Sequence, residues 1–166
     1  MPEKETIERA HEDAREGKSP STQAGEFVRE EIHHVREGKH GARSPQQAIA
    51  IGLSKARRAG VKLPAPKKGS TSAETREKAA HDTARGKSRS RRRPSRTRSR
   101  GVKRALRREG RSAASHRSLA RQAKGSARRR GASSRSAAAR KAVRTKGKAG
   151  LRGAARKAAR TRSRNR

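Results

Sequence analysis

Arginine and lysine are the residues of this chain best placed to do chemistry, and they concentrate in its C-terminal half. From residue 73 onward there are 35 Lys and Arg residues and four acids, a net charge of +31 within a chain total of +35. Segments of such charge repel one another when packed together. A nucleic-acid backbone removes the repulsion, because each phosphate that meets an Arg or Lys releases condensed counterions. We therefore expect these cations to contact phosphates without regard to base sequence.

The candidate phosphate-binding residues form two groups, and we expect no single member to dominate. The first group lies near the end of a predicted helix, where it could contact phosphate or complement the helix dipole: Lys55, Arg57 and Arg58. The second group is spread along the basic tail: Arg89, Arg91, Arg92, Arg93, Arg96, Arg98, Arg100, Arg107, Arg108, Arg128, Arg129, Arg130, Arg140, Lys141, Arg144, Arg156, Lys157 and Arg160.

Three histidines are the other residues with ligand chemistry. His33, His34 and His40 lie close together, and Glu30 precedes His34 by four residues. That spacing could form a weak metal site, but no second cluster completes a coordination set. We expect exposed helix histidines, no bound metal and no cofactor.

Catalytic patterns are missing. The sequence has no nucleophile elbow, no phosphate-cradling GxxxxGK[ST] loop and no cysteine. The acids cluster where no cleft is expected to raise the pKa of one carboxyl selectively. We expect neither enzyme activity nor a small-molecule substrate.

Composition limits the size of any core. Val, Ile, Leu and Phe number 15 in 166 residues, which is typical of chains with too little apolar area to offset chain entropy. One Phe and no Trp or Tyr exclude the aromatic platforms on which single-strand binders stack bases. The N-terminus is too charged for a signal peptide, and no window has the apolar length of a membrane span. We expect no membrane insertion and a cytoplasmic location, or a nuclear one if the source is a eukaryote.

The predicted fold is all-α: a small N-terminal module of two to three short helices, then a largely disordered, transiently helical basic tail. The divisions are a module (1–64), a linker (65–72), a polar helix (73–86) that repeats 5–17, and the tail (87–166). Nine of the 15 large apolar residues lie between Phe27 and Leu63. If the chain has a core, we expect it there, and the small buried area leaves room for self-association through the helices of 20–63.

Capping signals delimit the module's helices. Ser19-Pro20 predicts a helix start and Gly38 its end, with apolar residues at helical spacing between them. Ser44 and Pro45 predict the start of the next helix, where Gln47 could close a capping box onto Ser44. The following Val-Lys-Leu-Pro segment (61–64) is expected to be extended and to fold back against this helix.

Two internal repeats are visible. ETIERAHEDAREGKS at 5–19 aligns without gaps on ETREKAAHDTARGKS at 74–88, with eight of fifteen positions identical. AARKAVRT at 138–145 recurs as AARKAART at 154–161. Short helices are expected at 102–108, 113–124, 134–145 and 154–161. Alanine favours helix, whereas like charges four residues apart oppose it, so we expect mostly coil in solution and helix on a polyanion.

The run ARSPQQAIAIGLSKARRAGVKLP, with the preceding STQAGEFVREEIHHVREGKHG, resembles a family of short bacterial proteins known as a domain of unknown function. The resemblance covers about residues 19–64 and implies a bacterial source and a small helical module, without any activity. The composition of the tail is similar to that of bacterial histone-H1-like nucleoid proteins, although here Arg outnumbers Lys.

These observations favour a nonspecific, nucleoid-associated DNA-binding protein. Binding to RNA, as an rRNA-associated protein or an RNA chaperone, is an alternative, because Arg-rich arms suit RNA equally well. A second alternative is a stress or protein-interaction protein, in which the helical module binds a protein partner and the tail serves only as a tether. Gln46 and Gln47 stand where a recognition helix would begin, but a lone helix pair is a weak signal for sequence-specific readout.

Overall fold

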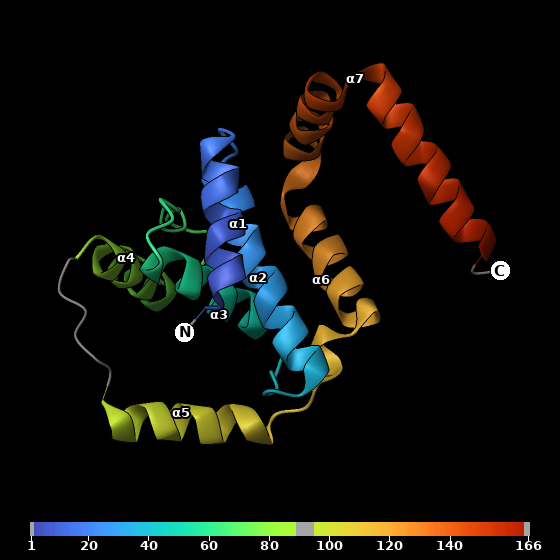
Figure 1. The fold of residues 1–166 in the computed structure, drawn as a ribbon. Coiled ribbons are helices and arrows are strands. Elements are labelled where there is room, and N and C mark those ends of the chain that lie inside the picture. Colours follow the sequence, from blue (N-terminus) through green and yellow to red (C-terminus); the bar gives the residue numbers. More distant parts are fainter. Residues whose placement is uncertain (1, 89–94, 165–166) are drawn as a thin grey trace. The chain divides into compact units, whose positions relative to one another are not determined.

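A computed structural model describes residues 2–88 and 95–164 of the chain (Figure 1). Over these residues every regular element is a helix, which confirms the predicted all-α class. The elements are α1 (Lys4–Arg15), α2 (Pro20–Glu37), α3 (Pro45–Arg58), α4 (Ala73–Lys87), α5 (Arg96–Arg108), the short 3-10 helix η1 (Ser112–Ala114), α6 (His116–Arg129) and α7 (Gly131–Arg164).

The helix starts follow the predicted capping residues, with two differences in detail. The Ser44 hydroxyl accepts a hydrogen bond from Gln47 N at 3.2 Å, as a cap should. The Gln47 side chain, however, accepts from Arg43 N at 2.7 Å, so the predicted capping box onto Ser44 N is wrong. Ser19 stands at the N-cap of α2 without a side-chain cap bond.

Helix α2 contributes to two groups of buried apolar side chains that follow one another along its length. In its C-terminal half, Ile32 and Val35 pack with Ala48 of α3. In its N-terminal half, Phe27, 1% exposed, packs with Ala10 of α1 and other small residues. Val61 also belongs to this second group, with Leu63 packed against it, so the predicted return of the 61–64 segment is confirmed.

Gly52 sets how closely α3 approaches α2. A Cβ at this position would lie 2.7 Å from Val28 Cα and 3.0 Å from the Phe27 carbonyl oxygen, closer than real side-chain carbons come. The two helices are therefore in backbone contact here, and a bare α-carbon is needed to allow it.

The 15-residue repeat has a structural counterpart. Its first copy forms α1, which packs against α2, and its second copy forms α4, which packs against α3. Ala10 in the first copy aligns with Ala79 in the second, and both are buried, at 2% and 5% exposure. Both copies thus use the same small residue to lie close to the central helix pair.

The structure does not support the predicted largely disordered tail. Residues 96–108 and 116–129 are helical, and so are the two parts of α7 on either side of Gly147, where the backbone is not helical. The short helices predicted at 102–108, 134–145 and 154–161 lie inside these longer ones. The helix predicted at 113–124 begins too early, because Ser112–Ala114 form a 3-10 turn and α6 begins at His116. Alanine, arginine and lysine are all strong helix formers, and over this stretch their propensity exceeds the opposing charge repulsion.

Part of the basic half belongs to the core. Ala113 and Ala114 of η1 are buried with Ile32, Val35 and Ala48. Residues 1–120 form one compact unit and residues 121–166 a second. The predicted divisions at residues 64, 72 and 86 stay predictions, but residues 112–119 extend the first unit beyond them. Within the described residues, each helix is too short or too polar to cross a membrane.

Candidate nucleic-acid interface

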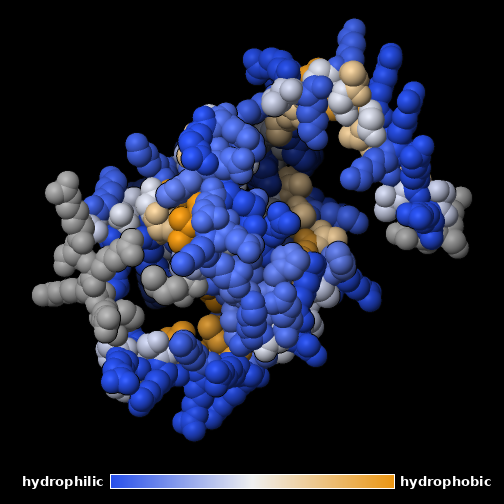
Figure 2. Space-filling view, viewed as in Figure 1, coloured by the Kyte–Doolittle hydropathy of each residue, from blue (hydrophilic) through white to orange (hydrophobic). Residues whose placement is uncertain are grey.

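The tail cations that the structure describes are all exposed. On α5 they are Arg96, Arg98, Arg100, Arg107 and Arg108; on or beside α6 they are Arg128, Arg129 and Arg130; on α7 they are Arg140, Lys141, Arg144, Arg156, Lys157 and Arg160. Arg89, Arg91, Arg92 and Arg93 lie outside the described residues. Figure 2 shows long hydrophilic side chains projecting along α7.

These side chains have no carboxylate partners. None of the ion pairs among the described residues involves a cation of residues 95–164. Residues 121–166 contain 18 Lys and Arg and no acid at all. The charge of the second unit is therefore not balanced within it.

Helix α7 presents its cations in a regular order. Gly147, with φ 63° and ψ 175°, interrupts the helix, and the two AARKA(V/A)RT repeats lie on either side of this kink (Figure 1). After the kink a cation recurs at every fourth residue: Lys148, Arg152, Arg156, Arg160 and Arg164. A four-residue step advances about 6 Å along a helix and keeps the side chains on neighbouring positions of one face. The result is a stripe of like charge.

Lys55 is placed very differently from the tail. Its side chain is 17% exposed, and its Nζ lies 2.6 Å from Glu31 Oε2 and 3.1 Å from Glu30 Oε1. The Glu30 carboxylate also accepts a hydrogen bond from Glu3 N. Burial raises the pKa of Glu30, but the hydrogen bonds from Glu3 N, Lys55 and Thr6 outweigh it and hold that pKa below its usual range. Lys55 is thus the internal counterion of two carboxylates.

Arg57 is buried, at 7% exposure. Its Nη2 donates a hydrogen bond to the Pro64 carbonyl oxygen at 3.3 Å, while Nε has no partner. Burial lowers the pKa of Arg57, and the carboxylate of Asp82 acts in the opposite direction. This guanidinium therefore serves the fold and is not presented to solvent.

Comparison with known proteins concerns the helix pair that carries these residues. Residues 17–69 match a family model described as "Family of unknown function (DUF6496)". The match covers about a third of the chain and agrees with the expected likeness to an uncharacterised domain. None of the curated proteins and none of the solved structures compared with the chain matches it.

The segment that matches DUF6496 includes α2, α3 and residues Val61–Leu63, which pack back against these helices. It ends before the basic tail. The buried charged residues Glu30, Glu31 and Arg57 lie inside it, and so does Lys55, which pairs with the two carboxylates. The matched segment is thus the packed helix pair, and the stretch richest in exposed cations lies outside it.

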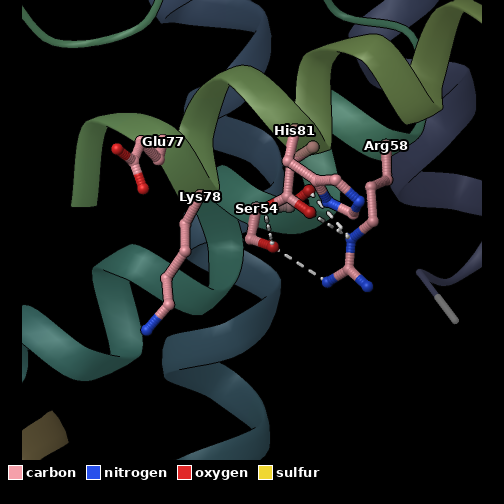
Figure 3. A pocket seen from close by; sticks show the side chains of 6 residues that line it. Ser54, Arg58, Glu77, Lys78 and His81 are labelled. Carbon is pink, nitrogen blue, oxygen red and sulfur yellow. Dashed lines mark hydrogen bonds and ion pairs between the residues drawn. The ribbon is translucent and has the colours of Figure 1, made fainter. Parts of the chain in front are cut away.

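Arg58 lies at the edge of the DUF6496 segment, where α4 packs on α3. Its Nε is 3.5 Å from Asp82 Oδ1, its Nη2 donates to Ser54 Oγ at 2.9 Å, and Ser54 Oγ in turn donates to Asp82 at 2.6 Å. Figure 3 shows Ser54 and Arg58 beside His81 in the open pocket that these side chains line with Glu77 and Lys78. Arg58 is half-exposed and joins two helices.

Sequence reasoning missed Glu31 and Asp82. A signal for Glu31 was present: it follows Phe27 by four residues and precedes Val35 by four, so it lies on the apolar stripe of α2. A carboxylate on that stripe must be buried and needs a cation, and Lys55 supplies one. Asp82 carried no such local signal.

Proposed function

We propose that this protein binds nucleic acid nonspecifically, with duplex DNA as its main target, through phosphate contacts of its C-terminal helices. The proposal includes a nucleoid-associated, histone-H1-like role in a bacterial cell. One observation carries it: residues 121–166 hold 18 cations and no acid, and all of these cations that the structure describes are exposed. Such a surface has no internal counterion, so a polyanion is the partner that its charge demands.

Exposure supports the tail, and not the Lys55 cluster, as the binding element. Lys55 and Arg57 are occupied inside the fold, and a phosphate contact would require them to leave buried partners. Arg58 already pairs with Asp82. We assign the phosphate contacts to α5, the end of α6 and α7.

Nonspecific binding fits the side chains available. Base readout in the major groove uses Asn, Gln or Arg held in a fixed geometry on a docked helix. The side chain of Gln47 is used in the cap of α3 through Arg43 N. The cations of α7 recur on a regular helix with short alanines between them, an arrangement that follows backbone charge and not base edges.

The test is the salt dependence of binding to a duplex of arbitrary sequence. If ten phosphates are neutralised, log affinity falls with log salt concentration with a slope of about −9. A chain truncated after Ala120 keeps the first compact unit, including Ala113 and Ala114, and its fold is checked by circular dichroism. We expect this truncation to lose most of the slope.

Two results would contradict the proposal. One is a slope near −2 for the full chain, and the other is unchanged affinity in the folded 1–120 truncation. Competition between duplex DNA and structured RNA at matched salt decides between the DNA and RNA forms of the proposal. A preference for RNA would make RNA the main ligand, while the same cations would still form the binding surface.

A further inference from the structure

A set of metal-ligand side chains lies at the C-terminal end of α2. Glu31, His34 and His40 each offer one donor atom, and the three atoms lie within 4.8 Å of one another. Glu31 and His34 are three residues apart on α2 and so share a face. Gly38, with φ 79°, caps the helix and turns the chain so that His40 returns to it.

Glu31 is the buried centre of the set. Its side chain is 1% exposed, and neither of its oxygens accepts a well-directed hydrogen bond, although Lys55 Nζ lies 2.6 Å from Oε2 and His40 Nε2 lies 3.0 Å from Oε1. Buried carboxylates are ordinarily satisfied by several donors. Lys55 accounts for one oxygen of Glu31 and leaves Oε1 facing His40.

Both histidines are oriented by their outer ring nitrogens. His34 Nε2 lies 2.9 Å from Glu3 Oε1, and His40 Nδ1 lies 3.0 Å from the Gly41 carbonyl oxygen. Metal-bound histidines almost always donate their second N–H to a carboxylate or a backbone carbonyl in this way. The nitrogens that remain for a ligand bond are His34 Nδ1, which lies 3.9 Å from Glu30 Oε1, and His40 Nε2. The side chains of His34 and His40 are 12% and 18% exposed, so the expectation of exposed histidines is wrong for these two and holds for His33.

The contact between His40 and Glu31 has the geometry of two converging ligand atoms: His40 Nε2 faces Glu31 Oε1 at 3.0 Å. With the other ring nitrogen, Nδ1, directed at the Gly41 carbonyl oxygen, Nε2 is the ring atom that can offer a lone pair to an ion held between the two residues. In a tetrahedral zinc site with bonds of about 2.0–2.2 Å, ligand atoms lie roughly 3.4 Å apart. Here the His40–Glu31 pair lies 3.0 Å apart and all three donor atoms lie within 4.8 Å, so the set has to tighten by about an ångström around an ion.

We propose that Glu31, His34 and His40 bind a divalent transition metal ion, with Zn²⁺ the best match. Two imidazoles and a carboxylate form a zinc donor set that leaves a fourth position for water or another ligand. Glu3 holds His34 from behind, while Glu30 pairs with Lys55 and so limits the repulsion between that ammonium and the metal. The ion would fasten the turn after α2 to the helix itself. This proposal is independent of nucleic-acid binding.

The experiment uses the full-length protein without nucleic acid. Zn²⁺ is titrated by calorimetry, and Co²⁺ is titrated by visible absorption because tetrahedral nitrogen–oxygen coordination gives it a characteristic intense spectrum. We expect one ion per chain and no comparable binding of Mg²⁺, which prefers oxygen ligands. Wild-type protein that binds no Zn²⁺, or gives no tetrahedral Co²⁺ spectrum, would overturn the proposal.

Variants locate the ion. His40→Ala removes a ligand from the turn that follows α2. His33→Ala is the matched control, because His33 lies on α2 with its side chain exposed. We expect His40→Ala to weaken Zn²⁺ binding at least tenfold and His33→Ala to leave it unchanged. Glu3→Gln, which changes the group behind His34, should weaken binding by roughly tenfold or more. Equal affinity in wild type and His40→Ala would refute the site.

Nitrogen NMR of the wild-type histidines keeps the test decisive if a variant fails to fold. We expect the signals of His34 Nδ1 and His40 Nε2 to shift on Zn²⁺ addition. A His40 ring that is doubly protonated at neutral pH and unaffected by Zn²⁺ would mean that a proton alone fills the gap to Glu31.

Discussion

Arg36 on α2 donates a hydrogen bond from Nε to the carbonyl oxygen of Ala114 at 2.9 Å, although 78 positions separate the two residues. Ala114 itself is 0% exposed, and Gly41 N and Ala42 N bond to the Leu106 and Gly110 carbonyls nearby. The first unit therefore includes residues from the basic half, and any account of its stability must include them.

Enlarging Ala114 should destabilise the protein. A Leu at this fully enclosed position must displace side chains of α2 and α3, and overpacking of this kind costs about 1–3 kcal/mol. The control is Ala139→Leu, at an exposed position of α7, which should change stability by no more than about 0.5 kcal/mol. Urea unfolding measures both. Equal stability of the two variants would mean that η1 does not belong to the core.

The backbone contact at Gly52 gives a second prediction, with Gly25 as its control. Gly52→Ala places a methyl group 2.7 Å from Val28 Cα, so we expect a loss of stability or a shift of α3 relative to α2. Gly25 is also inside a helix but has open space around it, and Ala there should stabilise by about 0.5–1 kcal/mol. The two thermal midpoints should move in opposite directions. A stabilising Gly52→Ala would contradict the close approach.

The caps of α2 and α3 should differ in strength. Ser44 Oγ accepts a hydrogen bond from Gln47 N, whereas the Ser19 hydroxyl bonds to the hydroxyls of Ser21 and Thr22 and caps no backbone N–H of α2. Ser44→Ala should therefore cost about 1 kcal/mol, and Ser19→Ala clearly less. Denaturant unfolding of the two variants measures the difference. A larger loss for Ser19→Ala would show that the assigned cap of α2 is incomplete.

Local signals predicted α2 and α3 well, whereas α5, which also belongs to the first unit, begins at Arg96 and not at the expected residue 102. Ser44 with Pro45 at one end and glycines such as Gly38 at the other are properties of a few adjacent residues, so the sequence alone locates the boundaries. The burial of Ala113 and Ala114 could not be read in this way. A pair of alanines between two serines in a basic stretch has no periodicity, and its partners on α2, α3 and the connection between them lie 65 to 82 positions away.

The candidate site residues show the same difference between local signals and contacts that depend on the fold. Exposure of the tail cations follows from their number, because so many like charges cannot be buried together. The internal roles of Lys55 and Arg57 depend on where Glu31, Pro64 and Asp82 lie in space, and charge counting assigned the two cations to phosphate. Only the fold shows which cations already have partners.

Arg57 offers a direct test of that distinction. Its guanidinium is buried with an unpartnered Nε, and replacing a buried charge by an apolar side chain of similar length is often neutral or stabilising. We expect Arg57→Met to leave the thermal midpoint unchanged or raise it, and to leave DNA affinity unchanged. Arg58→Met, which removes the half-exposed pair with Asp82, should cost at most about 1 kcal/mol. A folded Arg57→Met protein with tenfold weaker DNA binding would make Arg57 a phosphate ligand after all.

Charge position, and not net charge alone, should control binding to DNA. Replacing Arg140, Arg144, Arg156 and Arg160 of α7 by Gln removes four exposed, unpaired cations at equivalent places in the two repeats. If each contacts one phosphate, the slope of log affinity against log salt becomes shallower by up to about 3.6. The helix should persist, because Gln is a good helix former and the like-charge repulsion is reduced.

The matched control removes the same net charge from the first unit by changing four other cations to Gln: Lys4, Arg15, Lys62 and Lys67. These four side chains are exposed, and among the described residues none of them forms an ion pair. Long-range attraction falls equally in both variants, and it is screened beyond about 10 Å at 0.1 M salt, so only short-range phosphate contacts separate them. We expect the control to keep nearly the full slope. If both variants lose the same part of the slope, net charge alone attracts DNA, and α7 does not form a specific phosphate-binding surface.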